Sequence, residues 1–180
     1  MLETERLRLR TWQPSDREPF AQMNADPCVM EFFPNCLTRE ESDAMVDRIE
    51  AHFRSKGSGL YAAELRDDGR FIGYIGLHAP TFEAHFTPCV EIGWRLASDV
   101  WGRGLATEGA LAVARHAFEN LGLNEIVSFT VPTNQRSIRV MEKIGMTHDA
   151  AGDFEHPSLP AGHSLWHHVL YRLRNPVKTQ

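Results

Sequence analysis

The stretch that decides the fold is Glu91-Ile-Gly-Trp-Arg-Leu-Ala-Ser-Asp-Val-Trp-Gly-Arg-Gly-Leu-Ala-Thr-Glu-Gly109. Around its start, Val90, Ile92, Trp94 and Leu96 alternate along one side, which predicts a strand with one face in a core. A loop with two glycines comes next, and apolar residues at helical spacing follow that loop. The stretch therefore predicts a strand, a glycine loop and the start of a helix.

The helix expected after the loop has an apolar stripe and a glycine near its end. Leu111, Ala114, Phe118 and Leu121 recur at helical spacing, and Gly122 fits the position just after a helix end. We expect the stripe to pack against a sheet, because an amphipathic helix buries its apolar face.

The two loop glycines lie where the first free amide N–H groups of this helix emerge. Such amides, together with the positive end of the helix dipole, attract a phosphate group. Glycine at Gly102 and Gly104 removes the Cβ that would hold an anion away from the backbone. The loop therefore indicates a site for a phosphate-bearing ligand, and the alternative is a plain tight turn.

Two familiar nucleotide-binding motifs do not fit this loop. A dinucleotide fingerprint would need a third glycine at Thr107. A Walker loop needs Gly-Lys-Ser or Gly-Lys-Thr after four intervening residues, which the sequence lacks. The phosphate-bearing ligand is therefore expected to be held by another kind of site.

The composition is typical of a folded protein that lies outside membranes. The chain has 180 residues, 42% hydrophobic and 24% charged, and its net charge of −5 argues against a nucleic-acid-binding surface. No apolar run reaches transmembrane length, and the charged N-terminus predicts no signal peptide. Cys28, Cys36 and Cys89 form no Cys-x-x-Cys pair, so we expect free thiols in a cytoplasmic protein.

The rest of the chain predicts one domain over residues 1–175, with residues 176–180 as a frayed tail. Thr38-Arg-Glu-Glu41 is a capping-box pattern, and Asp68-Gly69 predicts a hairpin turn. Successive middle strands imply antiparallel pairing, and later strand–helix–strand steps allow parallel pairing. The expected strands are residues 5–12, 60–65, 71–77, 90–96, 125–131, 146–151 and 166–173, and the expected helices are residues 14–25, 38–56, 105–121 and 134–144.

Two motifs carry a resemblance to a known family. Trp101-Gly-Arg-Gly-Leu-Ala-Thr-Glu108, preceded by Glu91-Ile-Gly-Trp-Arg-Leu96, closely resembles the coenzyme-A-binding segment of the GNAT acetyltransferases. Asn134-Gln-Arg-Ser137, followed by Lys143-Ile-Gly-Met146, resembles a second family motif, Asn-x-x-Ser leading to Lys-x-Gly-Phe. Within the superfamily the chain looks like the ribosomal-protein-alanine N-acetyltransferases.

The two ends of the chain extend this resemblance over nearly its whole length. Glu5-Arg-Leu-Arg-Leu-Arg10 and Val169-Leu-Tyr-Arg-Leu173 look like the ends of that subfamily. Trp101 stands where the broad superfamily usually has Gln or Arg, but the subfamily often has an aromatic residue there. The resemblance implies an α/β (α+β) fold, with a GNAT-like mixed, mostly antiparallel sheet flanked by helices in a single domain.

The resemblance also implies the co-substrate and its contacts. Acetyl-CoA is expected in a cleft where two neighbouring strands splay apart, with its pantetheine arm on strand backbone and its pyrophosphate on the loop amides. No metal is expected. The implied cofactor-binding residues are Trp94, Arg95, Leu96, Trp101, Gly102, Arg103, Gly104, Leu105, Ala106, Thr107, Asn134 and Ser137.

Three side chains are catalytic candidates, because an acceptor amine must lose a proton and the CoA thiolate must gain one. Glu91 is the candidate general base, and its alternative is an exposed strand carboxylate. Ser137 would place a hydroxyl near the CoA sulfur, or it is a surface serine of a first helical turn. Tyr171 would protonate the thiolate, or it packs in the core.

Other polar residues have simpler explanations beside a functional one. Asn134 is a favoured helix N-cap residue, a role compatible with a cofactor contact. Glu108 is expected to favour the dipole of its helix rather than to bind phosphate. His167 and His168 point to opposite faces of a strand, which disfavours a shared metal, and His163 and His167 are candidates for an acceptor pocket.

The leading hypothesis is an enzyme that moves an acetyl group from acetyl-CoA to a primary amine by direct attack on the thioester. Its acceptor is either the N-terminal α-amine of a protein, such as a ribosomal protein, or a small-molecule amine. The competing hypothesis is a catalytically inactive module that binds CoA as a sensor or partner. Neither hypothesis involves nucleic acid or a membrane, and a homodimer fits both.

Overall fold

The computed structural model describes residues 1–176, and the chain divides into two compact units. The first comprises Met1–Leu77 and Gly93–Val113, and the second His78–Ile92 and Ala114–Gln180. The expected frayed tail falls, for residues 177–180, outside the described residues. The single domain over residues 1–175 stays a prediction.

Strands and helices follow one another in the order expected from the sequence, with two additional short strands, β1 and β8. Short 3-10 helices span Pro14–Asp16, Ser98–Val100 and Ala150–Gly152. The main elements are β1 (Leu2–Glu3), β2 (Leu7–Arg10), α1 (Arg17–Ala25), α2 (Arg39–Lys56), β3 (Leu60–Leu65), β4 (Phe71–His78), β5 (Glu91–Leu96), α3 (Leu105–Glu119), β6 (Glu125–Thr130), α4 (Gln135–Lys143), β7 (Thr147–His148), β8 (Phe154–Glu155) and β9 (His167–Arg174).

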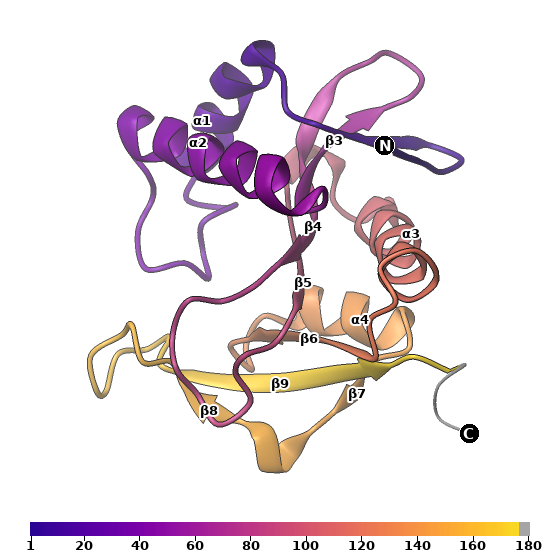
Figure 1. Ribbon diagram of the computed structural model, residues 1–180. Helices are drawn as coiled ribbons and strands as arrows, with labels where there is room; N and C mark the ends of the chain where they lie inside the picture. The colour runs from indigo at the N-terminus through magenta and orange to yellow at the C-terminus, as the bar shows by residue number, and fades with distance from the viewer. Residues whose placement is uncertain (177–180) are drawn as a thin grey trace. The chain divides into compact units, whose positions relative to one another are not determined.

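The first unit is an antiparallel sheet with helices on both faces (Figure 1). Strands β1 to β4 pair in chain order, and β3 joins β4 through the predicted turn, where Gly69 has a φ of 73°. On one face, Ala62 and Tyr74 belong to a core shared with α1 and α2. On the other face, Ile75 and Leu7 lie against Gly109 of α3.

Local signals explain where α2 begins and ends. The Thr38 side chain accepts a hydrogen bond from the Glu41 N–H, and the Glu41 carboxylate accepts one from the Thr38 N–H, which completes the predicted capping box. Gly57 ends the helix with a left-handed φ of 72°. Between these two ends, Val46 and Ile49 lie on the face of α2 that packs into the core.

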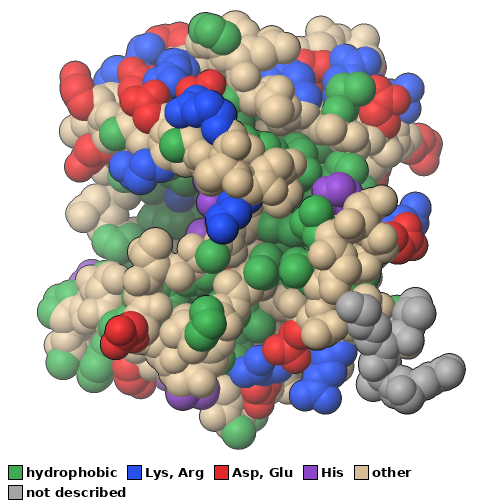
Figure 2. Space-filling view, viewed as in Figure 1, with side chains coloured by type: hydrophobic (Ala, Val, Ile, Leu, Met, Phe, Trp, Pro, Cys, Tyr) green, Lys and Arg blue, Asp and Glu red, His purple; other side chains and the backbone are tan. Residues whose placement is uncertain are grey.

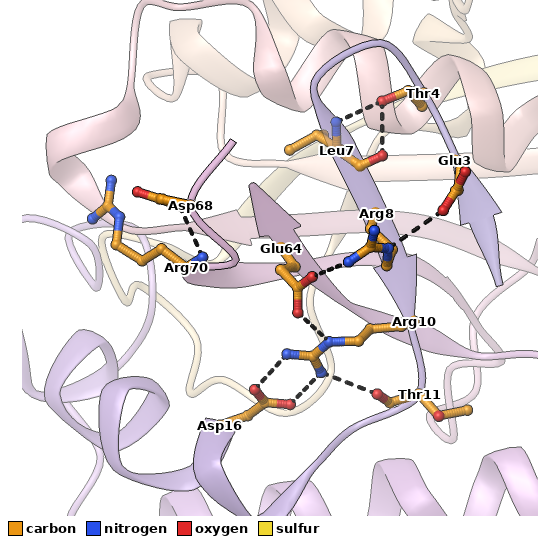
Figure 3. A network of polar contacts seen from close by, with 10 residues as sticks. All are labelled: Glu3, Thr4, Leu7, Arg8, Arg10, Thr11, Asp16, Glu64, Asp68 and Arg70. Carbon is orange, nitrogen blue, oxygen red and sulfur yellow. Dashed lines mark hydrogen bonds and ion pairs between the residues drawn. The ribbon is translucent and has the colours of Figure 1, made fainter. Parts of the chain in front are cut away.

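A network of buried charges joins the sheet of the first unit to its first helical turn (Figure 3). Arg10 on β2 donates to both oxygens of Asp16, at 2.7 and 2.8 Å, and to Glu64 on β3 at 2.6 Å. Arg8 donates to the other oxygen of Glu64 at 2.7 Å. Because a buried charge is costly without a partner, these bidentate contacts hold Arg10 in place at low cost.

The second unit is a smaller sheet with one aromatic face. Strand β5 pairs in parallel with β6 through Glu91 and Val127, and β9 pairs antiparallel with β6, β7 and β8. With one parallel pairing among antiparallel ones in the described residues, the predicted mixed, mostly antiparallel sheet flanked by helices is confirmed. On one face of β6 and β9, an apolar cluster gathers Phe86, Val127, Phe154 and Leu170.

Two predictions of burial were wrong. Leu111 in α3 and Leu121, just beyond its end, are 44% and 38% exposed, and the buried face of α3 instead runs through small residues. In β5, Trp94 is only half-buried whereas Arg95 is buried, so the expected alternation fails after Ile92. Period-two alternation assumes one solvent-facing side, and β5 is covered on both sides at Arg95.

The surface carries both signs of charge. On the face drawn in Figure 2, acidic and basic side chains are interspersed and form no single basic patch. Among the described residues, no helix has both the length and the apolar character that a membrane crossing needs.

Gly73 is expected to be the least replaceable glycine of the first sheet. Its φ is +129°, and a Cβ there would lie 2.1 Å from the backbone oxygen of Arg95. Gly73→Ala should therefore lower the free energy of unfolding by more than about 2 kcal/mol, measured by urea denaturation. The control Gly69→Ala, with φ +73° and open space around it, should cost only about 1 kcal/mol. Equal losses would contradict this explanation.

Candidate functional site

The expected site residues fall into two groups, one in each unit. In the first unit, the glycine loop leads directly into α3. Gly102 and Gly104 have φ values of 74° and 79°, a region that favours glycine. The Glu108 N–H donates to the Gly104 carbonyl at 3.0 Å, so Gly104 is the residue from which α3 starts.

The loop and the first turn of α3 present a row of free amide groups. Among the described residues, none accepts a hydrogen bond from the backbone N–H groups of Gly102 to Thr107. The first amides of a helix have no partner within it, and the positive end of the dipole adds to their attraction for an anion. A Cβ on Gly102 would meet no atom within 4 Å, so the space beside the loop is open. The row therefore fits a phosphate or pyrophosphate group.

Arg6 and Glu108 hold this loop from its other side. The Glu108 carboxylate accepts hydrogen bonds from the Thr4 hydroxyl at 2.6 Å, the Arg6 N–H at 2.8 Å and the Arg6 Nε at 2.7 Å. Arg6 Nη1 in turn donates to the Arg103 carbonyl at 2.8 Å. Burial acts to raise the pKa of Glu108, but these hydrogen bonds outweigh it, so the pKa lies below its usual value. Glu108 is thus ionised and paired, and Arg6 reduces its repulsion of an anion at the loop.

Trp101 has a structural role in the same segment. Its indole Nε1 donates to the Leu96 carbonyl at 2.9 Å, and its ring packs against the core of the first unit. This contact joins the end of β5 to the loop. Of the three β5 residues expected to contact the pantetheine arm, Leu96 and Arg95 are buried and Trp94 is half-buried. The Arg103 side chain is exposed beside the row of amides.

In the second unit, Glu91 is a carboxylate held near a histidine. Its side chain is 12% exposed, and Oε2 lies 3.3 Å from His78 Nε2. Burial raises the pKa of Glu91 well above its usual value. Burial also raises the pKa of the neighbouring Cys89 thiol to about 11, and the Glu91 charge adds to that shift. A carboxylate with a raised pKa is a stronger base than an exposed one, so the strand carboxylate is suited to accept a proton.

Asn134 is the N-cap of α4, as its residue type predicts. Its Oδ1 accepts from the Ser137 N–H at 3.2 Å, and its Nδ2 donates to the Thr130 hydroxyl at 3.0 Å. Ser137 lies in the first turn, half-buried. The cap fixes the Asn134 amide, while one lone pair and one N–H of that amide remain available for another contact.

Tyr171 lies on β9 in register with Ser128 on β6, and it is 7% exposed. Its ring stacks on His148, with centroids 5.1 Å apart. Burial raises the pKa of the phenol, and the carboxylates of Glu142 and Asp153 add to the shift. The phenol carries its proton at neutral pH, as phenols ordinarily do.

The histidines differ from one another in their surroundings. His163 accepts a hydrogen bond from the Leu165 N–H at 3.1 Å, and His167 is exposed and lies 3.2 Å from Glu155. His156 and His168 instead lie among aromatic rings of the second unit, and burial lowers the pKa of His168 to about 4. Among residues 1–176, no three His, Cys, Asp or Glu side chains are grouped to hold a metal ion.

Two residues that adjoin the site had no signal in the sequence. Arg6 is 102 positions from Glu108, and His78 is separated from Glu91 by a loop. Arg6 belongs to the motif Glu5-Arg-Leu-Arg-Leu-Arg10, but that motif does not predict its contact with Glu108, since each residue acts through a partner that only the folded chain brings near.

Comparisons with known proteins agree with this geometry. Residues 6–147 match the family described as Acetyltransferase (GNAT) domain. The chain is similar to the uncharacterized N-acetyltransferase YnaD of Bacillus subtilis (strain 168), with 28% identity over 173 residues, which cover 96% of this chain and 95% of the relative. It is also similar to the crystal structure of a GNAT-family acetyltransferase from Bacillus anthracis, with a TM-score of 0.79, 27% identity and coverage of 97% and 98%.

Solved structures of lower identity share the fold alone. One is the ribosomal-protein-S5-alanine acetyltransferase from Vibrio fischeri, with a TM-score of 0.76, 16% identity and coverage of 97% of this chain and 96% of that one. Another is spermidine N-acetyltransferase from Vibrio cholerae in complex with CoA and spermine, with a TM-score of 0.74, 16% identity and coverage of 96% and 97%. The two are named for different acceptors.

Glu91→Gln is expected to stabilise the protein increasingly as the pH rises. Because the pKa of Glu91 is higher in the folded than in the unfolded chain, the folded state favours the protonated form. The resulting stability is present below the unfolded pKa and is lost as the pH rises through the folded pKa, whereas glutamine has no charge to bury. The variant's gain in unfolding free energy over the wild type should therefore be larger at about pH 8 than at about pH 5, by urea denaturation.

The exposed Glu119→Gln serves as the matched control and should show no such trend. A gain for Glu91→Gln that does not change with pH would mean that the Glu91 carboxylate is not held in a desolvated environment.

Proposed function

The chain belongs to the GNAT acetyltransferase family and is an acetyl-CoA-dependent N-acetyltransferase, and we propose that it acetylates a primary amine. The observation that carries the proposal is the row of unpartnered amides from Gly102 to Thr107. When bound, acetyl-CoA supplies the thioester that is to be cleaved. The rest of the proposal concerns what this chain's own residues do.

The glycine loop binds the pyrophosphate of the co-substrate in this proposal. The space beside Gly102 is open, and the glycines at 102 and 104 carry no Cβ that would hold an anion away from the backbone. Leu105, Ala106 and Thr107 contribute the first amides of α3. Arg6 keeps the loop in this conformation through the Arg103 carbonyl, and Trp101 anchors its start to β5.

Glu91 acts as the general base. An α-amine has a pKa of roughly 8 and is mostly protonated at neutral pH, so it must lose a proton before it attacks. The raised pKa of Glu91 lies closer to the pKa of the amine. This favours transfer of a proton from the amine to the carboxylate, either directly or through a water molecule. His78, at 3.3 Å, is positioned to orient the carboxylate.

Ser137 and Tyr171 supply the proton that the leaving thiolate needs. Tyr171 carries its phenolic proton at neutral pH, as phenols ordinarily do, and burial raises its pKa further. Ser137 has a hydroxyl in the first turn of α4, where the helix dipole favours negative charge, and Asn134 holds that turn. The amine nitrogen gains the acyl carbon and loses a proton, the carbon–sulfur bond breaks, and the sulfur is protonated.

The acceptor is a protein N-terminal α-amine or a small-molecule amine. Structural neighbours named for a ribosomal-protein alanine and for spermidine support both classes equally. A fold does not determine an acceptor, because acceptor pockets diverge while the cofactor site persists. A cytoplasmic location and a homodimer remain part of this proposal.

Acetyl-CoA is expected to raise the melting temperature of the protein. A ligand that binds only the folded state adds roughly 2.7 kcal/mol at about 100 times its Kd. Gly104→Val should abolish the rise, because a β-branched residue at φ +79° is strained and distorts the loop, and its Cβ would lie 3.6 Å from Arg6 Nη2. Gly69→Val, at a similar φ in the distant hairpin turn, should destabilise the protein yet keep the rise. A rise retained in Gly104→Val would show that phosphate binds elsewhere.

Glu91→Gln is expected to lower kcat about a hundredfold or more while the KM for acetyl-CoA stays nearly constant. The wild-type rate should fall with decreasing pH as Glu91 is protonated at its raised pKa, and the variant should lack that limb of the profile. The kinetic constants and the pH dependence of the rate are both measured by the release of CoA. An unchanged rate would remove Glu91 from the mechanism, and acetyl-CoA binding without turnover of any amine would favour an inactive CoA-binding module.

A further inference from the structure

Arg95 is a buried cation to which no described residue offers a carboxylate. Its side chain lies in the first unit and the residue is 7% exposed. Nη1 donates to Asn24 Oδ1 at 2.6 Å, whereas Nε is enclosed and has no acceptor among residues 1–176. A guanidinium has five N–H donors and its charge is costly to bury without a partner. Most of its hydrogen-bonding capacity is therefore unused.

Its neighbours orient Arg95 without neutralising it. The Phe33 ring lies 4.0 Å and the Tyr74 ring 5.5 Å from Cζ, which is cation–π contact with the guanidinium. Asn24 Nδ2 donates to the Ser42 hydroxyl at 2.9 Å, and both residues are fully buried. Because Ser42 holds the amide nitrogen, the Asn24 oxygen is kept toward Arg95.

The same unit contains a buried arginine that shows the opposite arrangement. Arg10 is 8% exposed, close to the 7% of Arg95, yet it is paired with two carboxylates, Asp16 and Glu64 (Figure 3). Arg10 is thus satisfied within the fold. Arg95 has an oriented guanidinium, aromatic neighbours and a neutral amide in place of an acid, which is the arrangement expected of a site that takes its anion from a ligand.

We propose that Arg95 binds a carboxylate of the acyl acceptor, so that the acceptor is an amine that also carries an acid group. This inference rests on the proposed function. A carboxylate matches the two-pronged geometry of a guanidinium and would be held through Nη1 and Nη2, because Nε is enclosed within the fold. Its source is either the α-carboxylate of a free amino acid or an acidic side chain close to a peptide's N-terminus. Arg95 would then determine specificity, beside the backbone contact that its position in β5 implies.

The kinetic test compares matched acceptors on the full-length protein. Each free α-amino acid is paired with its carboxamide, and each amidated peptide with Asp at its second position is paired with the Asn version. We expect kcat/KM to favour the acid member of at least one kind of pair by about tenfold or more, mainly through KM. A preference for the free amino acid over its carboxamide identifies a free amino acid as the source of the carboxylate. A preference for the Asp peptide over the Asn peptide identifies a peptide as the source. Acetylation of amines with no preference in either kind would overturn the proposal.

Two substitutions separate anion binding from a structural role. Asn24→Asp supplies Arg95 with a carboxylate at the position of the present Asn24 oxygen, so it should preserve the fold but abolish the preference for acids. Arg95→Met should abolish it as well, and Arg95→Lys should retain part of it, because lysine keeps the charge but loses the planar fork. If Arg95 has only a structural role, Asn24→Asp leaves the acid preference intact. A rise in the KM for acetyl-CoA instead of the acceptor would also overturn the proposal.

A binding measurement tests the site without turnover. Calorimetric titration with benzoate and with benzamide compares a planar carboxylate with its uncharged counterpart. The wild type should bind benzoate at least about tenfold more tightly than benzamide, and Asn24→Asp should lose that difference. Arg10→Met, which disrupts a buried arginine of structural role, should retain it in the folded fraction. Benzoate binding that is absent, or equal in the wild type and Asn24→Asp, would contradict the inference.

These outcomes remain distinct from failure of the proposed function. If acetyl-CoA produces no thermal stabilisation and no amine releases CoA, the acetyltransferase proposal fails, while the benzoate titration still reports on Arg95. If acetyl-CoA binds and amines are acetylated but acids and amides react alike, only the inference about Arg95 fails.

Discussion

The first turn of α3 imposes the constraint on which the rest of the first unit depends. A helix must begin with amides that no residue of the helix can pair, and here the loop before it leaves those of Gly102 to Thr107 free. Keeping such a row open requires support from elsewhere. Arg6 supplies it by bonding to the Arg103 carbonyl and to Glu108, and Trp101 supplies it by bonding to the end of β5. Arg6 and Glu108 are thus occupied with one another, and the amides of the row remain for a ligand.

Buried arginines of the first unit differ in whether the fold supplies an acidic partner, and this difference distinguishes a structural residue from a candidate functional one. Arg10 is fully paired with Asp16 and Glu64, which removes the cost of its burial within the fold. Arg95 has a similar exposure, but among residues 1–176 its one hydrogen-bond partner is Asn24. The difference is chemical rather than positional, because an amide orients a guanidinium and leaves its charge available. A ligand with a carboxylate would pair with Arg95 as the carboxylates of the fold pair with Arg10.

Burial also tunes proton affinity in the second unit. The pKa of Glu91 is raised because its carboxylate is desolvated, and the pKa of Tyr171 is raised mainly for the same reason. Desolvation makes the carboxylate a better proton acceptor and leaves the phenol protonated at neutral pH. The sheet thus holds one group suited to take a proton and another suited to give one, which is the pair that aminolysis of a thioester requires.

The sequence by itself determined the features that depend on neighbours a few positions apart. The capping box at Thr38 and the Asn134 cap follow from hydrogen bonds between side chains and nearby backbone groups. The hairpin turn at Gly69 and the glycine loop before α3 follow from local backbone dihedral angles. The tertiary structure decided the rest. Arg6 meets Glu108 across 102 positions and Arg95 meets Asn24 across 71. Whether a charged side chain is paired, desolvated or left for a ligand depends on which groups, distant in the sequence, surround it in the fold. No local sequence pattern predicts which groups these are.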